Sequence, residues 1–224
     1  MTERPANNPF AQTRIRYKVS NYPIPHNEKE RRKALDSYDL LNTLSEAEYD
    51  RLTELASIIC EVPIALISLV DEKRQWFKSK VGLDVNETSR DLAFCQYAIM
   101  GTERFDVYDA ALDDRFKEND LVTGDPNIRF YSGQPLIDPD CFALGTICVI
   151  DRKPRVLTDA QKRALEILAR EAISLITERK QKHDLQYFEK LFQFSNDLIC
   201  IAGTDGFFKK VNGAFSKILG WDES

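Results

Sequence analysis

Two stretches of the chain are almost entirely apolar, and they predict strands in the middle of a sheet. Ile64–Val70 reads IALISLV and Phe142–Ile150 reads FALGTICVI. A strand that is apolar on both faces must be covered on both faces, so neither stretch fits a sheet edge. Strict alternation along the second stretch places on one face Phe142, Leu144, Cys148 and Ile150, and on the other Ala143, Gly145, Ile147 and Val149.

Two further stretches predict strands with a more mixed character. In Gln75–Val81 polar and apolar positions alternate, with Trp76, Lys78 and Lys80 on one face. This pattern is typical of an outer strand with one solvated side. A shorter strand is expected at Phe105–Tyr108.

The segment before the second apolar stretch predicts a hairpin. Ile128–Ile137 is a strand candidate, and the turn Asp138–Cys141 joins it to the apolar strand. A turn of this kind that closes into a bulge favours glycine with a positive φ at the position of Cys141. We expect the cysteine to cost about 1 kcal/mol there.

Helices are predicted after capping motifs at Asn27–Glu30, Ser45–Glu48 and Thr158–Gln161. Behind the second motif, apolar residues recur at helical spacing and predict one buried stripe made of Leu52, Leu55, Ala56 and Ile59. A further helix is expected to begin after Asp91, to run through Ala98–Met100 and to close at Gly101. Cys95 would lie in the first turn of that helix, where the helix dipole favours a thiolate.

The third capping motif opens a long helical pattern. Residues spaced by three and four resemble a coiled-coil seam, and they are Leu165, Leu168, Ala172 and Leu175. The register breaks over Arg179–Lys182, and Leu185 and Phe188 then resume it. We expect the first part of this helix both to pack on the sheet and to lead the chain onward.

The composition changes again at Phe192. The pattern predicts a strand at Leu198–Ala202, a strand at Phe207–Val211 and a helix at Asn212–Leu219. Two strands and one helix cannot close a core of their own, so the sequence indicates an incomplete second domain.

Composition narrows the class of protein. Of 224 residues, 43% are hydrophobic and 30% are charged, which is typical of a soluble globular chain. The net charge of −5 argues against a nucleic-acid partner, which requires a basic surface. The apolar stretches are too short to span a membrane, and the polar N-terminus has no signal-peptide core, so residues 1–26 are expected to form a flexible arm.

The cysteine and histidine content excludes some chemistry. Five cysteines in a chain without a signal peptide indicate free thiols in a reducing cytoplasm. Cysteine pairs spaced CxxC are absent, and the chain has only two histidines, His26 and His183. This donor set argues against a zinc site.

Residues from about 28 to 180 resemble a GAF domain of bacterial sensor proteins. The resemblance rests on VPIALISLVDEKRQWFKS, DLAFCQYAI, DDRFKENDLVTGDPNIRFYSGQPL and ALGTICVID, which occur in that order. Residues from about 190 resemble the start of a PAS domain through NDLICIAGTDGFFKKVNGAFSKILGW. We therefore expect an arm at 1–26, a GAF domain at 27–178, a helical linker at 179–191 and an incomplete PAS domain at 192–224.

The resemblance implies an α+β fold in which helices flank an antiparallel sheet with a pocket for a small molecule. It also implies a homodimer that forms through the first and last helices. The long helix would carry the signal to a kinase or cyclase domain further along the same chain, and its candidate positions are Leu165, Leu168, Ala172, Leu175, Leu185 and Phe188.

Seven residues are candidates for the ligand pocket, namely Phe77, Phe94, Cys95, Asp114, Arg115, Arg129 and Tyr131. Each also has a purely structural interpretation. The aromatic residues suit a core, Cys95 suits a buried inert thiol, and Asp114 and Arg115 suit ion pairs that fasten the loop Asp113–Asp120. The sequence leaves both interpretations open.

Cofactors known from related folds do not match the residues. A bilin-attachment cysteine is typically followed by histidine, and none of the five cysteines is. Only His26, at the edge of the GAF-like region, could ligate haem. GAF-type methionine sulfoxide reductases use paired cysteines, and the hairpin separates Cys141 from Cys148. The cofactor therefore stays unknown.

The sequence thus predicts the sensory input part of a bacterial signalling protein, with a sensor histidine kinase as the leading context. One alternative is an input module of a diguanylate cyclase. The others are a redox sensor or enzyme that uses Cys95, and a dimerisation scaffold without a ligand. The chain contains no phosphate-binding glycine loop, phosphoacceptor segment or other catalytic motif.

Overall fold

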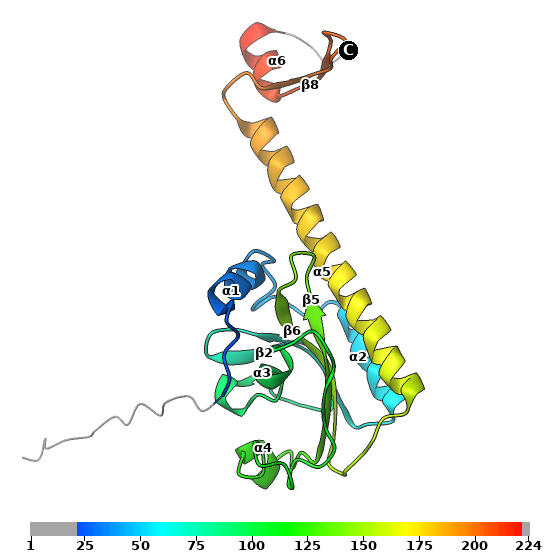
Figure 1. Ribbon diagram of the computed structural model, residues 1–224. Coiled ribbons are helices and arrows are strands. Elements are labelled where there is room, and N and C mark those ends of the chain that lie inside the picture. Colours follow the sequence, from blue (N-terminus) through cyan, green and yellow to red (C-terminus); the bar gives the residue numbers. More distant parts are fainter. Residues whose placement is uncertain (1–21, 221–224) are drawn as a thin grey trace, which may run out of the picture.

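A computed structural model describes residues 22–220, and an antiparallel sheet of six strands forms its centre (Figure 1). Residues 1–21, most of the expected N-terminal arm, lie outside the described part of the chain. The strand order is β3-β2-β1-β6-β5-β4. The strands are β1 (Ile64–Val70), β2 (Arg74–Val81), β3 (Glu87–Ser89), β4 (Phe105–Val107), β5 (Phe130–Ile137) and β6 (Ala143–Asp151).

The two apolar stretches occupy the middle of this sheet, as the sequence predicts. Strands β1 and β6 pair with each other from Ile64 opposite Ile150 to Leu69 opposite Gly145. Every residue of both strands is buried. The predicted hairpin of β5 and β6 is also confirmed, and Cys141 in its turn has the expected positive φ, +66°.

Helices cover both faces of the sheet (Figure 1). Helix α2 (Ala47–Cys60) and the first half of α5 (Asp159–Phe194) pack on one face. The 3-10 turn η1, two short helices and their connecting loops cover the other face. These short elements are η1 (Arg90–Leu92), α3 (Cys95–Ala98) and α4 (Asp120–Thr123), while α1 (Glu28–Asp36) precedes them near one end of the sheet. This is the α+β architecture that the sequence predicts.

Strand β2 differs from the solvated outer strand that its alternation predicts. It is covered by β3 at the edge, and Lys78 is only 3% exposed. Ile67 pairs with Ser79 and Ser68 pairs with Phe77, so Lys78 is the extra residue of a β-bulge. The segment before α2 encloses the lysine, because Lys78 Nζ donates to Leu44 O at 2.8 Å and pairs with Glu46 at 2.5 Å.

A second bulge corrects the predicted faces of β6. Leu136 pairs with Gly145 and Ile137 pairs with Ala143, which leaves Leu144 as an extra residue. Leu144 therefore packs in the cluster beneath α2 and α5, and does not share a face with Cys148. Periodicity alone cannot reveal such an insertion.

Helices begin at or beside all three predicted capping motifs, but two of the motifs lack the expected capping hydrogen bonds. Asn27 precedes α1 and Glu46 precedes α2, and neither makes a side-chain hydrogen bond to its helix start in the described structure. The Ser45 hydroxyl instead donates to Asp50 at 2.5 Å. The capping box at Thr158 and Gln161 is confirmed at the start of α5.

The predicted stripe of α2 is only half buried. Leu52 and Ala56 are in the core, whereas Leu55 is 45% exposed and Ile59 is 39% exposed. Tyr49, another α2 residue, is buried in the core as well. The buried face is therefore rotated toward residues that the apolar pattern did not include.

The helix expected after Asp91 is replaced by two short turns. The 3-10 turn η1 ends at Leu92, Ala93 is extended, and α3 then spans only Cys95–Ala98. Gly101 lies beyond the end of α3 and is not among the glycines with positive φ, so it is not a left-handed helix cap. Cys95 is the first residue of a single helical turn, which is too short for a helix-dipole argument.

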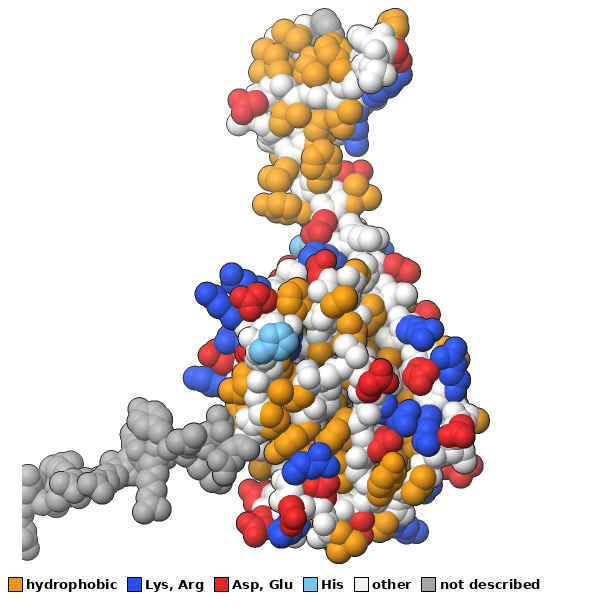
Figure 2. Space-filling view, viewed as in Figure 1, with side chains coloured by type: hydrophobic (Ala, Val, Ile, Leu, Met, Phe, Trp, Pro, Cys, Tyr) orange, Lys and Arg blue, Asp and Glu red, His pale blue; other side chains and the backbone are white. Residues whose placement is uncertain are grey.

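Helix α5 runs without a break through the segment where the register shifts. Its first half is anchored by buried residues, namely Leu165, Leu168, Ala169, Ala172 and Ile176. Leu175 is partly buried, while Leu185 and Phe188 are 59% and 50% exposed. Exposed apolar side chains therefore gather on the second half of α5, as Figure 2 shows.

The C-terminal elements follow the predicted order. Strands β7 (Cys200–Ala202) and β8 (Phe208–Val211) form a two-stranded sheet, and α6 (Gly213–Leu219) follows. They lie at the far end of α5, away from the six-stranded sheet (Figure 1). No helix within residues 22–220 has both the length and the apolar character needed to cross a bilayer.

Candidate functional site

A cavity of about 500 Å³ lies on the face of the sheet opposite α2 and α5. Leu66 of β1, Phe77 of β2, Tyr131 of β5 and Ile150 of β6 contribute to its floor. The segment Ala93–Cys95 forms one wall. Because strands and a neighbouring turn supply its lining, the fold itself shapes this cavity.

Four of the seven predicted pocket residues line this cavity together. They are Phe77, Phe94, Cys95 and Tyr131. The ring centroids of Phe94 and Tyr131 are 5.3 Å apart. Phe94 also stacks on Phe116 at 4.0 Å, a contact that the sequence did not suggest because Phe116 lies in a polar loop.

The other three predicted residues are engaged outside the cavity lining. Arg129 precedes the start of β5, and its guanidinium donates to Val122 O at 2.8 Å and to Ile128 O at 3.0 Å. Its side chain therefore fastens the loop before β5 to the backbone. Arg129 and Tyr131 are two residues apart and were expected on the same face of a strand. Arg129 lies before the strand begins, where regular alternation does not hold, so only Tyr131 reaches the pocket.

Asp114 and Arg115 belong to local ion pairs of the polar loop. Arg115 pairs with Asp113 at 2.5 Å, and Asp114 pairs with Lys117 at 2.6 Å. The Arg115 guanidinium also lies 4.8 Å from the ring centroid of Phe105. These contacts match the structural interpretation, except that Arg115 pairs with Asp113 and not with Asp114.

Gln75 is a cavity residue that the sequence did not single out. Its side chain lines the cavity and is 5% exposed. Its Oε1 has no hydrogen-bond partner among residues 22–220. An unpaired buried amide oxygen costs free energy, so a ligand that donates a hydrogen bond to it would be stabilised.

Three hydroxyl groups converge on the sulfur of Cys95. Thr146 donates to Sγ at 3.0 Å, Ser68 at 3.1 Å and Tyr131 at 3.2 Å. The sulfur of Cys148 lies 3.9 Å away. Burial alone would raise the pKa of the Cys95 thiol, but these four hydrogen bonds outweigh it and lower the pKa to about 7.

The strands hold this cluster in place. Ser68 and Thr146 are cross-strand partners on β1 and β6. The Tyr131 hydroxyl folds back over Gly133, where an added Cβ would lie 2.1 Å from the hydroxyl oxygen. Ser68 and Thr146 are single polar residues within apolar strands, so little in the sequence pattern points to the cluster. The sulfur atoms that lie together are those of Cys95 and Cys148, and not those of Cys141 and Cys148, the pair that the hairpin separates.

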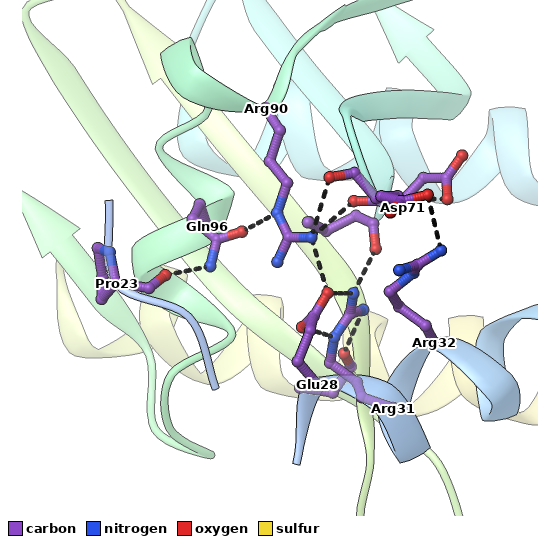
Figure 3. Close-up of polar contacts among 10 residues, drawn as sticks. Pro23, Glu28, Arg31, Arg32, Asp71, Arg90 and Gln96 are labelled. Carbon is purple, nitrogen blue, oxygen red and sulfur yellow. Dashed lines mark hydrogen bonds and ion pairs between the residues drawn. The ribbon is translucent and has the colours of Figure 1, made fainter. Parts of the chain in front are cut away.

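A buried polar network connects the cavity wall to the N-terminal helix (Figure 3). Next to Cys95, the amide of Gln96 donates to Pro23 O at 2.5 Å and accepts from Arg90 Nε. Arg90 also pairs with Glu28 at 2.7 Å, and Glu28 pairs with Arg31 at 2.8 Å. The segment before α1 and the wall of the cavity are therefore fastened to each other.

The charged groups of this network are buried, and the single carboxylate of Glu28 serves two guanidinium groups. Arg31 is 1% exposed and Arg90 is 3% exposed. Burial would raise the pKa of Glu28, but hydrogen bonds from Arg31 and Arg90 outweigh it and lower the pKa to about 2. The carboxylate thus stays ionised at neutral pH.

A second hollow of about 490 Å³ lies between β5 and α5 and carries charged side chains, among them Glu103, Arg104, Glu166 and Arg170. No unpaired buried polar atom of the described chain lies in it. We therefore regard the cavity beside Cys95 as the candidate site. Within residues 22–220, no three His, Cys, Asp or Glu side chains are grouped to hold a metal ion.

The fold has known relatives among solved structures. The chromophore-binding domain of the bacteriophytochrome RpBphP3 from R. palustris is 11% identical, covers 71% of this chain and 65% of its own, and has a TM-score of 0.50. The GAF domain of an Acinetobacter phosphoenolpyruvate-protein phosphotransferase is 16% identical, covers 70% of this chain and 96% of its own, and has a TM-score of 0.49. At such low identity the likeness to the bacteriophytochrome domain concerns the fold alone, an antiparallel sheet covered by helices.

Comparison of sequences adds one curated relative. A cyclic di-GMP phosphodiesterase of Pseudomonas aeruginosa is 44% identical over 133 residues. The match covers 59% of this chain, and it spans only 23% of the length of the relative. No family model matches the sequence.

Proposed function

We propose that this chain is a regulatory input module that binds a small molecule in the cavity beside Cys95. The observation that carries the proposal is the unpaired Oε1 of Gln75 in a cavity of about 500 Å³. Ligand pockets of this size typically combine an apolar lining with a few polar groups that orient the ligand. Gln75 is the polar group of this kind, and Leu66, Phe77 and Phe94 belong to the apolar lining around it.

The lining defines a ligand class. Phe77, Phe94 and Tyr131 favour a planar or largely apolar molecule, because aromatic side chains stack on flat groups. Oε1 of Gln75 selects for a hydrogen-bond donor on that molecule. Charged residues of both signs also line the cavity, namely Asp84, Glu87, Asp125 and Arg152, and Glu87 is paired with Arg74 at 2.5 Å. The charged lining therefore does not select the sign of the ligand's charge.

The long helix offers a route from the cavity to an output domain. Its first half packs on the same central strands that form the cavity floor, and its second half extends beyond the sheet. A ligand that prefers one packing of these layers would shift the population of α5 positions. In this proposal, Leu185 and Phe188 join the helix to that of a second copy, which makes a homodimer.

The activity that this module would regulate is proposed from the sequence relative. The sequence favoured a sensor histidine kinase and kept a diguanylate cyclase as an alternative, and a phosphodiesterase was not among the predicted outputs. The 44% identical segment belongs to a protein named as a cyclic di-GMP phosphodiesterase, which favours cyclic di-GMP turnover over phosphotransfer. Residues 192–220, with β7, β8 and α6, are proposed as the start of a PAS domain that continues from α5.

Native mass spectrometry tests the binding step. The chain purified from bacterial cytosol is expected to retain a small molecule, and the Leu83→Trp variant is expected to lose it, because Leu83 lines the cavity and is half-buried. Leu112→Trp is the matched control, since Leu112 is 81% exposed and outside the cavity lining. Wild-type chain that carries no added mass and gains none from a library of planar metabolites would favour the scaffold alternative.

A further inference from the structure

The two sulfur atoms beside the cavity differ in their access to it. Cys95 lines the cavity, whereas Cys148 lies behind it on β6 at an Sγ–Sγ distance of 3.9 Å. Both side chains are almost completely buried from bulk solvent, at 1% and 0% exposed. A molecule small enough to enter the cavity would therefore contact Cys95 first. Cys148 lies behind Cys95 and would react with Cys95 and not with the molecule.

The surroundings of Cys95 suit a thiolate more than a thiol. The hydroxyl oxygens of Ser68, Thr146 and Tyr131 all lie 3.0 to 3.2 Å from one sulfur, so each can donate its proton to it, although Ser68 and Thr146 also lie 3.1 Å from each other. Cys148 can add a fourth donor through its S–H. A neutral thiol is a weak hydrogen-bond acceptor, whereas a thiolate is a strong one. Several donors around one sulfur therefore stabilise the thiolate form.

We propose that Cys95 and Cys148 form a thiol pair that a small, uncharged hydroperoxide oxidises to an intramolecular disulfide. Cys95 is the attacking sulfur and Cys148 is the resolving sulfur. The inference goes beyond the proposed function, because it requires only the cavity as an entry path and no bound ligand.

Oxidation of the pair takes two steps. The Cys95 thiolate attacks one peroxide oxygen, so that an S–O bond forms, the O–O bond breaks, and hydroxide or alkoxide leaves. The sulfur loses two electrons, which the peroxide gains, and becomes a sulfenic acid. The Cys148 sulfur then attacks Cys95, the S–S bond forms and the S–O bond breaks. The departing hydroxide takes the Cys148 proton and becomes water.

Closure of the disulfide moves the wall of the cavity. An S–S bond is about 2.0 Å long, so the two sulfurs must approach by nearly half of their present 3.9 Å separation. Cys95 opens α3, between the cavity residue Phe94 and the network residue Gln96. Oxidation would therefore shift both the cavity lining and the contacts to Arg90 and Pro23 (Figure 3).

The chain contains its own control for burial. Cys60 is 1% exposed, like Cys95, but burial raises the pKa of its thiol to about 11. No hydroxyl hydrogen bond to Cys60 is found within residues 22–220. If burial alone decided reactivity, Cys60 and Cys95 would react alike. The proposal predicts that Cys95 reacts at least about tenfold faster.

The test uses the full chain with its exposed thiols removed by Cys141→Ser and Cys200→Ser. Folded protein is treated with hydrogen peroxide, blocked with N-ethylmaleimide in denaturant, digested and analysed by mass spectrometry. The expected product is a peptide pair joined through Cys95 and Cys148, with Cys60 still alkylated. In the further variant Cys148→Ser, Cys95 is expected to accumulate as a sulfenic acid that dimedone traps.

Other outcomes overturn the proposal. Cys60 oxidised as fast as Cys95, or Cys95 and Cys148 both recovered as free thiols after the treatment, would contradict it. Circular dichroism confirms that each variant is folded before it is scored. Ligand retention is measured separately on the reduced chain, so an inert thiol pair would leave the proposed binding function standing.

Conservative variants separate a reactive role from a packing role. Tyr131→Phe and Thr146→Val each remove one donor to Cys95 and keep the volume nearly unchanged. The rate of Cys95 alkylation by iodoacetamide is measured against pH in each. The midpoint of that profile is expected near pH 7 in the parent chain and at higher pH in both variants. An unchanged midpoint in both would mean that the hydroxyls do not stabilise a thiolate.

Discussion

The carboxylate of Glu28 in α1 lies 2.7 Å from the guanidinium of Arg90, which opens the 3-10 turn η1 before the wall of the cavity. The same carboxylate pairs with Arg31, whose guanidinium donates to Val70 O at 2.8 Å. Two paired side chains of the first helix thus connect it to its surroundings: Glu28 contacts the turn before the cavity wall, and Arg31 contacts a central strand.

Replacing Glu28 with glutamine is expected to destabilise the fold by about 3 kcal/mol, because two buried guanidinium groups lose their carboxylate. Urea unfolding at neutral pH measures the change. Glu30→Gln in the same turn is the control, since Glu30 is exposed. Equal stability of the two variants would show that the network does not stabilise α1.

The pH dependence of stability follows from the same carboxylate. The pKa of Glu28 is lowered to about 2 in the folded chain, from an ordinary value of 4.5. A lowered pKa stabilises the fold above the ordinary value, and this contribution is lost as the pH falls from about 4.5 toward 2. The unfolding free energy of Glu28→Gln should therefore decline less steeply than that of wild type in this range. Parallel curves would contradict the assignment.

Gly133→Ala is expected to destabilise the chain by about 1–3 kcal/mol. The added Cβ would lie 2.1 Å from the Tyr131 hydroxyl oxygen, so the ring must move away from Cys95. Gly101→Ala is the matched control, because a Cβ there meets no described atom within 4 Å, and its effect should stay within about 0.5 kcal/mol. The melting temperatures of the two variants show whether Gly133 is required for packing while Gly101 can be replaced.

Cys141→Gly is expected to stabilise the chain by about 1 kcal/mol. Cys141 has a φ of +66° and is exposed, so its Cβ adds strain. The measurement is the melting temperature under reducing conditions. A lower melting temperature in the variant would show that the thiol makes a stabilising contact.

Phe188→Glu is expected to weaken a homodimer that forms through the second half of α5. Phe188 is 50% exposed and follows the seam that includes Leu185. Gln186→Glu introduces the same charge at a neighbouring exposed position and should leave association unchanged. Sedimentation velocity of the three chains at several concentrations provides the comparison. A monomeric wild-type chain would refute the proposed dimer.

The sequence predicted the elements that depend on strong local patterns. The fully apolar segments became β1 and β6, and the Thr158 motif capped α5, because burial and capping act over a few residues. The predicted strand faces were wrong where one inserted residue interrupts the regular alternation of a strand. The bulges at Lys78 and Leu144 reversed the faces of their neighbours, and only pairing between strands determines where a bulge falls.

The candidate site was predictable only in part, because residue types are visible in the sequence but contacts between strands are not. Aromatic residues and Cys95 stood out by type, and four of the seven candidates line one cavity. The hydroxyl groups that donate to Cys95 belong to Ser68, Tyr131 and Thr146, which lie on neighbouring strands but are far apart in the sequence. Their convergence depends on strand register and on the space above Gly133, which no local pattern encodes.

The central claim, that occupancy of this cavity regulates an output domain, is tested most directly in a chimera. The 133 matching residues of this chain replace their counterpart in the Pseudomonas phosphodiesterase, with and without Leu83→Trp in the cavity. The measured quantity is the rate of cyclic di-GMP hydrolysis, with Leu112→Trp as the control. The account predicts that filling the cavity changes this rate several-fold while the control matches the unmodified chimera. Equal rates in all three active, folded chimeras would contradict it.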